Sequence, residues 1–281
     1  MIEDARSLIF DLDGTLYEDT DHFEFYAHLL KQKLPADKQG LFQTDYEKVL
    51  QGLHPLTIGT AYDLRENVIL TIDPYTNRAA SVLNWEGEEW LDQQVQIKYP
   101  DPVEFDFEHI IAIGDGWWLP YSVAVHYGVS LEDCHKCYMQ TKDYMVSDQF
   151  SLTHTHGLRE ALEEWKKDKT LILLTNSEEY DVQNLLSELG LKNMFHETIT
   201  SAKKPALTLS HFKRILEGYN LLPEQAVSIG DNFMNEIAPA LITDMKGILI
   251  QPTTVPYKHP NLQVVSTLRE IIPQIKRSDS Y

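Results

Sequence analysis

The sequence predicts an α/β fold: a doubly wound parallel sheet into which a second, mixed α+β domain is inserted. In the second half of the chain, short apolar runs alternate with helical patterns, as in parallel sheets whose strands are joined by helices. A strand pattern of the same kind, Ser7 to Phe10, stands near the start. The stretch between them breaks the alternation, and 281 residues suffice for two domains at roughly 100 to 200 residues each.

The core domain is expected over residues 1–17 and 152–281, and the insert over 18–151. Short apolar runs predict core strands at 7–10, 170–175, 197–200, 226–229 and 247–250. Helical periodicity predicts core helices at 157–167, after an N-cap at Ser177, around 209–216 and through 234–241. Ser266 or Thr267, together with Glu270, can cap a last helix that continues through Ile272.

The insert combines both kinds of secondary structure. A helix is expected from Asp21 to Leu34, and the stretch from Glu108 to Phe150 is expected to be mainly helical. Between them, a small antiparallel sheet is predicted from three strand-like runs: Asn67 to Ile72, Arg78 to Leu83 and Gln94 to Tyr99. The first two runs flank the turn-rich segment 73–77.

Composition excludes several classes of protein. Lys plus Arg number 24 against 43 Asp plus Glu, and the net charge of −19 repels nucleic-acid polymers as partners. No run approaches the ~20 apolar residues of a membrane span, so no membrane partner is expected. The N-terminus lacks a signal-peptide pattern, and two cysteines do not make a disulfide framework. We therefore expect a globular, cytoplasmic protein.

Polar segments follow four of the expected core strands, and open parallel sheets place ligands at the carboxyl ends of their strands. In chain order they are Asp11-Leu12-Asp13-Gly14-Thr15-Leu16, Leu174-Thr175-Asn176-Ser177, Lys203-Lys204-Pro205 and Ile229-Gly230-Asp231-Asn232-Phe233-Met234-Asn235-Glu236. If the chain turns at Gly14, the carboxylates of Asp11 and Asp13 can converge on one site. A carboxylate can attack phosphorus, which divides one difficult displacement into two easier ones. We therefore assign Asp11 as the candidate nucleophile.

The four segments together resemble the haloacid dehalogenase-like (HAD) superfamily. The resemblance covers residues 1 to 17 and about 152 to 275, and the insert stands where that family has its cap domain. It implies that Asp13 is the acid that protonates the leaving oxygen and then the base that activates water. Dehalogenating members of the superfamily lack this second aspartate, so its presence favours phosphoryl transfer over cleavage of a carbon–halogen bond.

Several carboxylates in one site repel each other and a phosphate, so a hard cation such as Mg²⁺ is expected among them. The positions that match the family's ligands are the side chains of Asp11 and Asp231 and the backbone carbonyl of Asp13. Glu236 stands where the family often has aspartate, and it could bind the ion through water or orient a ligand. Two asparagines of the same segment are candidates to orient these groups: Asn232 and Asn235.

Donors for the phosphoryl oxygens are expected from three sources. Thr175 offers a hydroxyl, and the backbone amides of Asn176 and Ser177 lie near a helix N-terminus. A lysine supplies a point charge. The family's lysine usually precedes a proline, which favours Lys204, and Lys203 stays open as the alternative.

These inferences predict a Mg²⁺-dependent phosphatase that hydrolyses a small phosphorylated metabolite through an aspartyl-phosphate intermediate. The substrate is not indicated, because in this superfamily the cap selects it and the expected hairpin departs from the common all-helical cap. An open cap would also admit a phosphoprotein. Two alternatives stay open: a phosphomutase with the same core, and a non-catalytic HAD-fold binding or regulatory module. The oligomeric state is not indicated either.

The candidate residues also have ordinary structural interpretations. Asp11 and Asp13 could form an acidic turn after a strand, and Asp231 could cap the following helix. The order and spacing of the four segments favour the catalytic interpretation. The segment Cys134-His135-Lys136-Cys137 suggests a zinc or redox site. Since no second cysteine pair and no thioredoxin-like strand accompany it, we expect a helix with two buried thiols.

Overall fold

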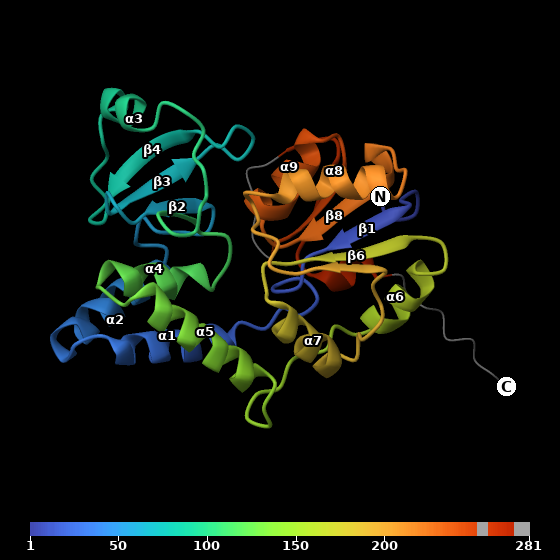
Figure 1. Ribbon diagram of the computed structural model, residues 1–281, viewed down its shortest axis with the longest axis horizontal. Coiled ribbons are helices and arrows are strands. Elements are labelled where there is room, and N and C mark those ends of the chain that lie inside the picture. Colours follow the sequence, from blue (N-terminus) through green and yellow to red (C-terminus); the bar gives the residue numbers. More distant parts are fainter. Residues whose placement is uncertain (252–257, 273–281) are drawn as a thin grey trace. The chain divides into compact units, whose positions relative to one another are not determined.

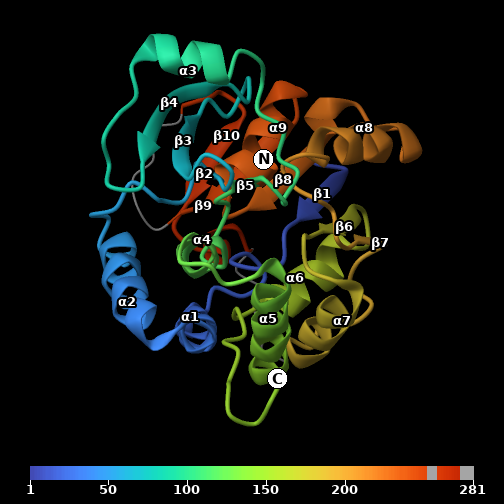
Figure 2. The ribbon, with the colours of Figure 1, turned by 60° about the vertical axis from the view of Figure 1, so that its left-hand side comes forward.

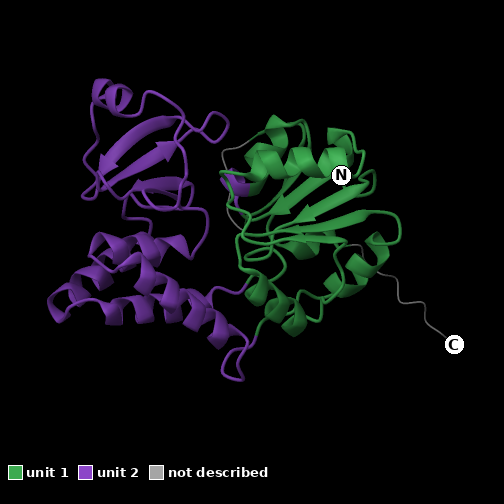
Figure 3. Ribbon diagram, viewed as in Figure 1, with its two compact units in different colours: residues 1–18, 152–231, 236–281 green, residues 19–151, 232–235 purple. Residues whose placement is uncertain are grey.

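The computed structural model describes residues 1–251 and 258–272, which fall into two compact units (Figure 3). The first unit contains Met1–Glu18, Leu152–Asp231 and the chain from Glu236 onward. The second contains Asp19–Ser151 and also Asn232–Asn235, a short segment that lies far along the sequence within the core region. Met234 of this segment packs in the hydrophobic core of the second unit.

The first unit is built on a six-stranded sheet with the strand order β10-β9-β8-β1-β6-β7, in which all neighbours are parallel (Figure 1). The strands are β1 (Ser7–Phe10), β6 (Thr170–Leu174), β7 (Glu197–Ile199), β8 (Ala226–Gly230), β9 (Lys246–Ile250) and β10 (Leu262–Val265). The chain leaves β1 toward β6 and β7 on one side, and later continues on the other side through β8. A doubly wound sheet of this kind is the predicted fold class, which is confirmed.

The central strand β1 is buried along its whole length, as expected for a strand with neighbours on both sides and helices on both faces. Its last residue, Phe10, lies opposite Leu173 of β6 and Ile229 of β8. These three strands therefore end side by side. The residues that follow them lie together at one edge of the sheet.

Helices cover both faces of this sheet (Figure 1). One face carries α6 (Leu158–Trp165) and α7 (Glu179–Glu188), and the other carries α8 (Thr208–Gly218) and α9 (Ala238–Ile242). Alternate side chains of β1 pack against the helices on opposite faces of the sheet. Phe10 stacks on Trp165 of α6 with ring centroids 6.2 Å apart, whereas Ile9 belongs to a core cluster with Phe212 of α8.

Parts of the core differ from the sequence-based prediction. The helix expected through 234–241 is divided into a π-helical turn, Phe233–Ile237, and the short α9, because Pro239 has no N–H with which to continue the helical ladder. The last predicted helix is a 3₁₀ turn, Leu268–Ile271, with Thr267 as its cap. In the sequence Ile272 precedes a proline, and the residue before a proline disfavours the α conformation. The strand β10 was not anticipated.

The second unit contains a helical layer and a four-stranded antiparallel sheet with the order β4-β3-β2-β5 (Figure 2). Its elements are α1 (Asp21–Lys33), α2 (Ala36–Leu50), β2 (Thr60–Asp63), β3 (Val68–Ile72), β4 (Ala79–Asn84), α3 (Asp92–Lys98), β5 (Ile110–Ala112), α4 (Trp118–His126) and α5 (Leu131–Met145). Helix α1 packs against α4 and α5. Among the residues described, no helix combines the length and the apolar character that a bilayer span requires.

The hairpin of β3 and β4 confirms the predicted antiparallel sheet. Its turn is organised by Asp73, whose Oδ1 accepts hydrogen bonds from the backbone N–H groups of Tyr75 at 3.0 Å and Thr76 at 2.9 Å. Aspartate favours turns because its side chain satisfies backbone donors in this way.

The strand predicted for Gln94–Tyr99 is wrong. These residues lie in α3, and Tyr99 is the C-cap of that helix. Apolar and polar residues alternate in it, but Ile97 is exposed and contributes to no core face. The side chain of Gln94 accepts a hydrogen bond from the backbone N–H of Leu91 at 2.9 Å, which satisfies a donor at the helix start. Glutamine and lysine also favour helices over strands.

Two further parts of the insert differ from the expectation. Residues Ile110–Ala112, assigned to a mainly helical stretch, form β5 and pair with β2. Helix α2 was not predicted. Cys134 and Cys137 are both fully buried free thiols in α5, as the ordinary interpretation of that segment expects.

Candidate active site

The loop after β1 turns sharply at Gly14, which adopts φ +73. A Cβ at this position would lie only 2.2 Å from Oδ2 of Asp231, so the site needs a residue without a side chain here. The backbone N–H of Asp11 donates to the carbonyl oxygen of Ile229 at 2.9 Å, which continues the pairing of β1 with β8 beyond the sheet. The turn therefore brings the end of β1 against the end of β8.

Three carboxylates meet at this edge of the sheet. Oxygen atoms of Asp11, Asp231 and Glu236 all lie within 4.8 Å of one another, and Asp11 and Glu236 are buried. Asp231 follows β8, and Glu236 comes from the π-helical turn; such turns are frequent at functional sites. Hard oxygen ligands at this spacing suit a divalent cation such as Mg²⁺.

Lys204 lies between two of these carboxylates. Its Nζ is 2.7 Å from Oδ1 of Asp11 and 2.6 Å from Oε1 of Glu236, and its side chain is 2% exposed. Burial alone would lower the pKa of Lys204, but the charges of Asp11 and Glu236 outweigh burial and raise it. The ammonium group is therefore kept charged. Lys203, the alternative left open by the sequence, is exposed.

The backbone of Lys204 is tied to the segment after β6. Nδ2 of Asn176 donates to the carbonyl oxygen of Lys204 at 3.0 Å, and the backbone N–H of Lys204 donates to Oδ1 of Asn176 at 2.7 Å. This reciprocal pair of hydrogen bonds fixes the backbone from which the side chain of Lys204 extends. Asn176 thus has a structural task in addition to the predicted contact of its amide with a phosphate.

Burial raises the pKa of Asp11, opposed by the positive charge of Lys204 and aided by the negative charge of Asp13. A buried carboxylate beside another acid favours the neutral form, because low polarity and like charge both penalise ionisation. A cation bound among the acids would oppose both effects.

Asp13 accepts hydrogen bonds on both of its carboxylate oxygens. The hydroxyl of Tyr17 donates to Oδ1, and the hydroxyl of Ser177 donates to Oδ2 at 2.7 Å. The backbone N–H of Ser177 donates to the hydroxyl oxygen of Thr175 at 3.1 Å. Ser177 therefore does not cap α7 as predicted: the residue before that helix is Glu178, and the serine hydroxyl is directed to Asp13.

Of the remaining candidates, Asn232 holds the loop that carries Glu236. Its Oδ1 accepts hydrogen bonds from the backbone N–H groups of Met234 at 2.9 Å and of Asn235 at 3.1 Å. Asn232, rather than Asp231, thus provides the cap that the ordinary interpretation assigned to the aspartate. Both asparagines are buried, and their proposed action on a bound ion stays a prediction.

Tyr17 is a residue at this site that the sequence did not single out. It lies four residues after Asp13, and its side chain is fully buried. A signal existed: an aromatic residue with a polar tip directly after an acidic turn needs a partner for its hydroxyl. In the structure this partner is Asp13.

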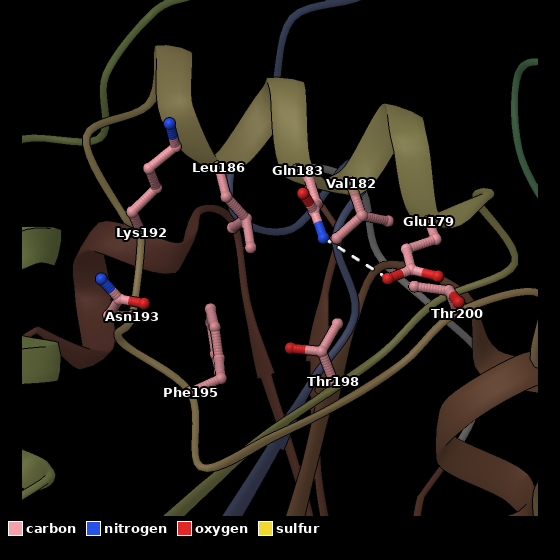
Figure 4. A pocket seen from close by; sticks show the side chains of 9 residues that line it. All are labelled: Glu179, Val182, Gln183, Leu186, Lys192, Asn193, Phe195, Thr198 and Thr200. Carbon is pink, nitrogen blue, oxygen red and sulfur yellow. Dashed lines mark hydrogen bonds between the residues drawn. The ribbon is translucent and has the colours of Figure 1, made fainter.

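A separate cavity of about 460 Å³ lies between α7 and β7 (Figure 4). Its walls include both charge signs, with Glu179 and Lys192, and an apolar surface that includes Phe195. None of the predicted site residues lines it. The candidate site at the edge of the sheet is therefore separate from this cavity.

Together, the parallel sheet and the acidic cluster around one buried lysine define a class of protein: an α/β protein with a carboxylate site at the switch point of its sheet. Comparison with known proteins supplies the family. A family model described as haloacid dehalogenase-like hydrolase matches residues 5–241. The chain therefore belongs to the haloacid dehalogenase-like hydrolases.

Two individual proteins illustrate the relationship. The chain is similar to haloacid dehalogenase-like hydrolase domain-containing protein 3 of Xenopus laevis, with 25% identity over 170 residues, which are 57% of this chain and 68% of that protein. It also resembles the crystal structure of the putative HAD-hydrolase YfnB from Bacillus subtilis bound to magnesium. That likeness has a TM-score of 0.52 and 14% identity over 95% of this chain and 96% of the other. At this identity it shows the fold alone.

Proposed function

We propose that this protein is a Mg²⁺-dependent phosphatase that hydrolyses a small phosphorylated metabolite through an aspartyl-phosphate on Asp11. The observation that carries the proposal is the cluster of Asp11, Asp231 and Glu236, with Lys204 between Asp11 and Glu236. Asp13 lies two residues beyond the proposed nucleophile. The magnesium in the related YfnB structure supports the choice of ion. The side chains of Asp11 and Asp231 and the backbone carbonyl of Asp13 would hold the ion, with Glu236 beside them.

In the first step, a carboxylate oxygen of Asp11 attacks phosphorus and forms an O–P bond. The bond from phosphorus to the ester oxygen breaks, and the carboxyl group of Asp13 gives its proton to that leaving oxygen. Lys204 and the hydroxyl of Thr175 provide positive charge and a donor for the phosphoryl oxygens. A bound Mg²⁺ would supply positive charge that screens these oxygens from the carboxylates.

In the second step, Asp13, now ionised, accepts a proton from water. The resulting hydroxide attacks phosphorus, the bond to Asp11 breaks, and inorganic phosphate leaves. Asp11 returns as a carboxylate and Asp13 returns protonated, so the cycle is closed. In this proposal the second unit is the cap domain, which selects the leaving group.

The test is release of inorganic phosphate from a panel of small phosphate esters, measured with Mg²⁺ and with EDTA. Wild type is compared with Asp11→Asn and with a matched control, Asp101→Asn, which changes an exposed aspartate of the second unit. We expect activity in wild type and in the control with Mg²⁺, and none with EDTA or in Asp11→Asn.

Other outcomes point to other functions. Activity that persists in Asp11→Asn would refute the nucleophile. Transfer of the phosphoryl group to a second position of the substrate without free phosphate would indicate a phosphomutase. Silence on every ester, with Mg²⁺ bound normally, would favour a binding or regulatory role.

A further inference from the structure

Two hydroxyl groups contact Asp13 from two different segments of the first unit. Tyr17 belongs to the loop after β1, and Ser177 to the loop between β6 and α7; the two loops lie side by side at the end of the sheet (Figure 1). The tyrosine hydroxyl donates to Oδ1, and the serine hydroxyl donates to Oδ2. Each oxygen of the carboxyl group is therefore held by a donor of its own.

Both donors are themselves held in place. Tyr17 is fully buried, so packing fixes its ring, and residues 13 and 17 form a short backbone bridge. Ser177 is 4% exposed, and its backbone N–H donates to Thr175. Its carbonyl oxygen accepts from the backbone N–H of Ser201 at 3.0 Å. The two hydroxyl groups thus occupy defined positions on rigid supports.

The terminal torsion of an aspartate side chain is broad when nothing holds it. An acid–base group acts only within hydrogen-bond reach of the atom that receives or gives the proton. Asp13 has to serve two such atoms in succession, the leaving oxygen and then a water molecule. A carboxyl plane fixed at both oxygens meets this requirement without rearrangement between the steps.

We propose that Tyr17 and Ser177 are positioning residues that fix the carboxyl plane of Asp13 for both proton transfers. This inference rests on the proposed function. Neither hydroxyl is consumed: each keeps its proton, and Asp13 alone gives and accepts protons. Ser177 thereby has a task different from the phosphate contact predicted for its backbone amide.

The first test is steady-state kinetics of Tyr17→Phe and Ser177→Ala on an ester that wild type hydrolyses. Each variant removes one hydroxyl and keeps the rest of the side chain in place. We expect kcat to fall roughly 10- to 100-fold, with KM changed by less than about twofold, because only the orientation of the acid–base group is affected. The matched control is Tyr62→Phe, which removes another buried hydroxyl that donates to Asn67 at 2.7 Å; its kcat should equal that of wild type.

A purely structural role of Tyr17 can be distinguished from positioning by measuring the effect of Tyr17→Phe both in wild type and in Asp13→Asn. In Asp13→Asn, which lacks the acid–base group, adding Tyr17→Phe should leave the residual rate unchanged. A structural role predicts the same fractional loss in both backgrounds. Equal fractional losses, or a wild-type kcat in Tyr17→Phe, would overturn the inference while Asp11→Asn still reports on the proposed function.

A second measurement does not depend on turnover. Crystal structures of Tyr17→Phe and Ser177→Ala should show the carboxyl group of Asp13 rotated, with Asp11 and Lys204 in place. An Asp13 carboxyl group in its wild-type orientation in both variants would refute positioning, whatever the activity. If wild type hydrolyses no ester, the proposed function fails, and these structures alone decide whether the two hydroxyls orient Asp13.

Discussion

Replacing Gly14 by alanine is expected to disable the acidic cluster, because the new methyl carbon would occupy the space of Asp231. An added Cβ would lie 2.2 Å from Oδ2 and 2.7 Å from Cγ of Asp231. Ordinary van der Waals contact begins at 3.4 Å, so the two groups must separate by about 1.2 Å, the difference from 2.2 Å. Asp231 would therefore leave the position in which it meets Asp11 and Glu236.

The magnitude follows from two separate effects. A displacement of about 1 Å in a catalytic group lowers the rate roughly 100-fold, so kcat/KM for a phosphate ester should fall by that order. The left-handed backbone at Gly14, with φ +73, adds a loss of stability of about 1–2 kcal/mol for alanine. Activity is measured by phosphate release. Ion binding is measured by the rise in unfolding temperature on adding Mg²⁺.

The matched control is Gly52→Ala. Gly52 also has a positive φ, +69, but a Cβ there would meet no atom within 4 Å. This variant should lose about the same 1–2 kcal/mol of stability and keep both the turnover and the response to Mg²⁺. If Gly14→Ala behaves like Gly52→Ala in activity and in the response to Mg²⁺, the close approach to Asp231 does not govern the site.

Three further predictions concern buried charged groups and thiols. Lys204→Met leaves the buried carboxylates of Asp11 and Glu236 without their cation, so urea unfolding at neutral pH should show a loss on the order of 3–5 kcal/mol; an unchanged stability would contradict the buried ion pair. Because burial raises the pKa of Asp11, the folded state binds that proton more tightly than the unfolded chain, and this group's contribution to wild-type stability falls as the pH rises above its usual pKa. In EDTA, Asp11→Asn should therefore gain stability relative to wild type as the pH rises from about 4 to about 7, and a difference that is independent of pH would be inconsistent with this shift. Burial also raises the pKa of Cys134 to about 12, so a thiol reagent should modify it only after unfolding; rapid reaction in the folded protein would show that the thiol is accessible.

The core of the fold was predictable because its signals are local. Runs such as Leu171 to Leu174 are apolar throughout, and only a strand covered on both faces needs that pattern. The motif after β1 was predictable for the same reason, since Asp11, Asp13 and Gly14 lie within one turn. Because these residues directly follow a strand, their position in the sequence identified the carboxyl edge of the sheet as the candidate site.

The insert was less predictable, because its short elements depend on partners distant in the sequence. The three residues of β5 become a strand only by pairing with β2, and Ile110–Ala112 alone carries no period that separates strand from helix. In the segment that forms α3, the alternation of apolar residues suggested a strand, but Val95 is buried whereas Ile97 is exposed. The sequence pattern of a strand therefore does not match the burial of these residues in the structure.

Within the site, spacing identified residue types but not contacts. The choice between Lys203 and Lys204 depends on which side chain the chain directs inward, and only the latter is buried. Ser177 was interpreted as a helix cap because serine before a helical pattern is typical of one. Its hydroxyl instead serves Asp13, which lies 164 residues away along the chain. No local rule reports a partner at that distance.

The position of β1 has a consequence for the order in which the protein assembles. This strand is made first, yet Ser7 pairs with Thr170 and Ala226, so both of its neighbours are made only after the whole of Asp19–Ser151. The apolar strand β1 is therefore unpaired while the intervening unit is synthesised. The long chain segment between β1 and its neighbours also slows folding, because a long loop has to be closed. Asp11 and Asp13 acquire their surroundings only when β8 arrives. A shortened chain that ends before Asp231 would retain the motif after β1 but lack two of the three carboxylates of the cluster.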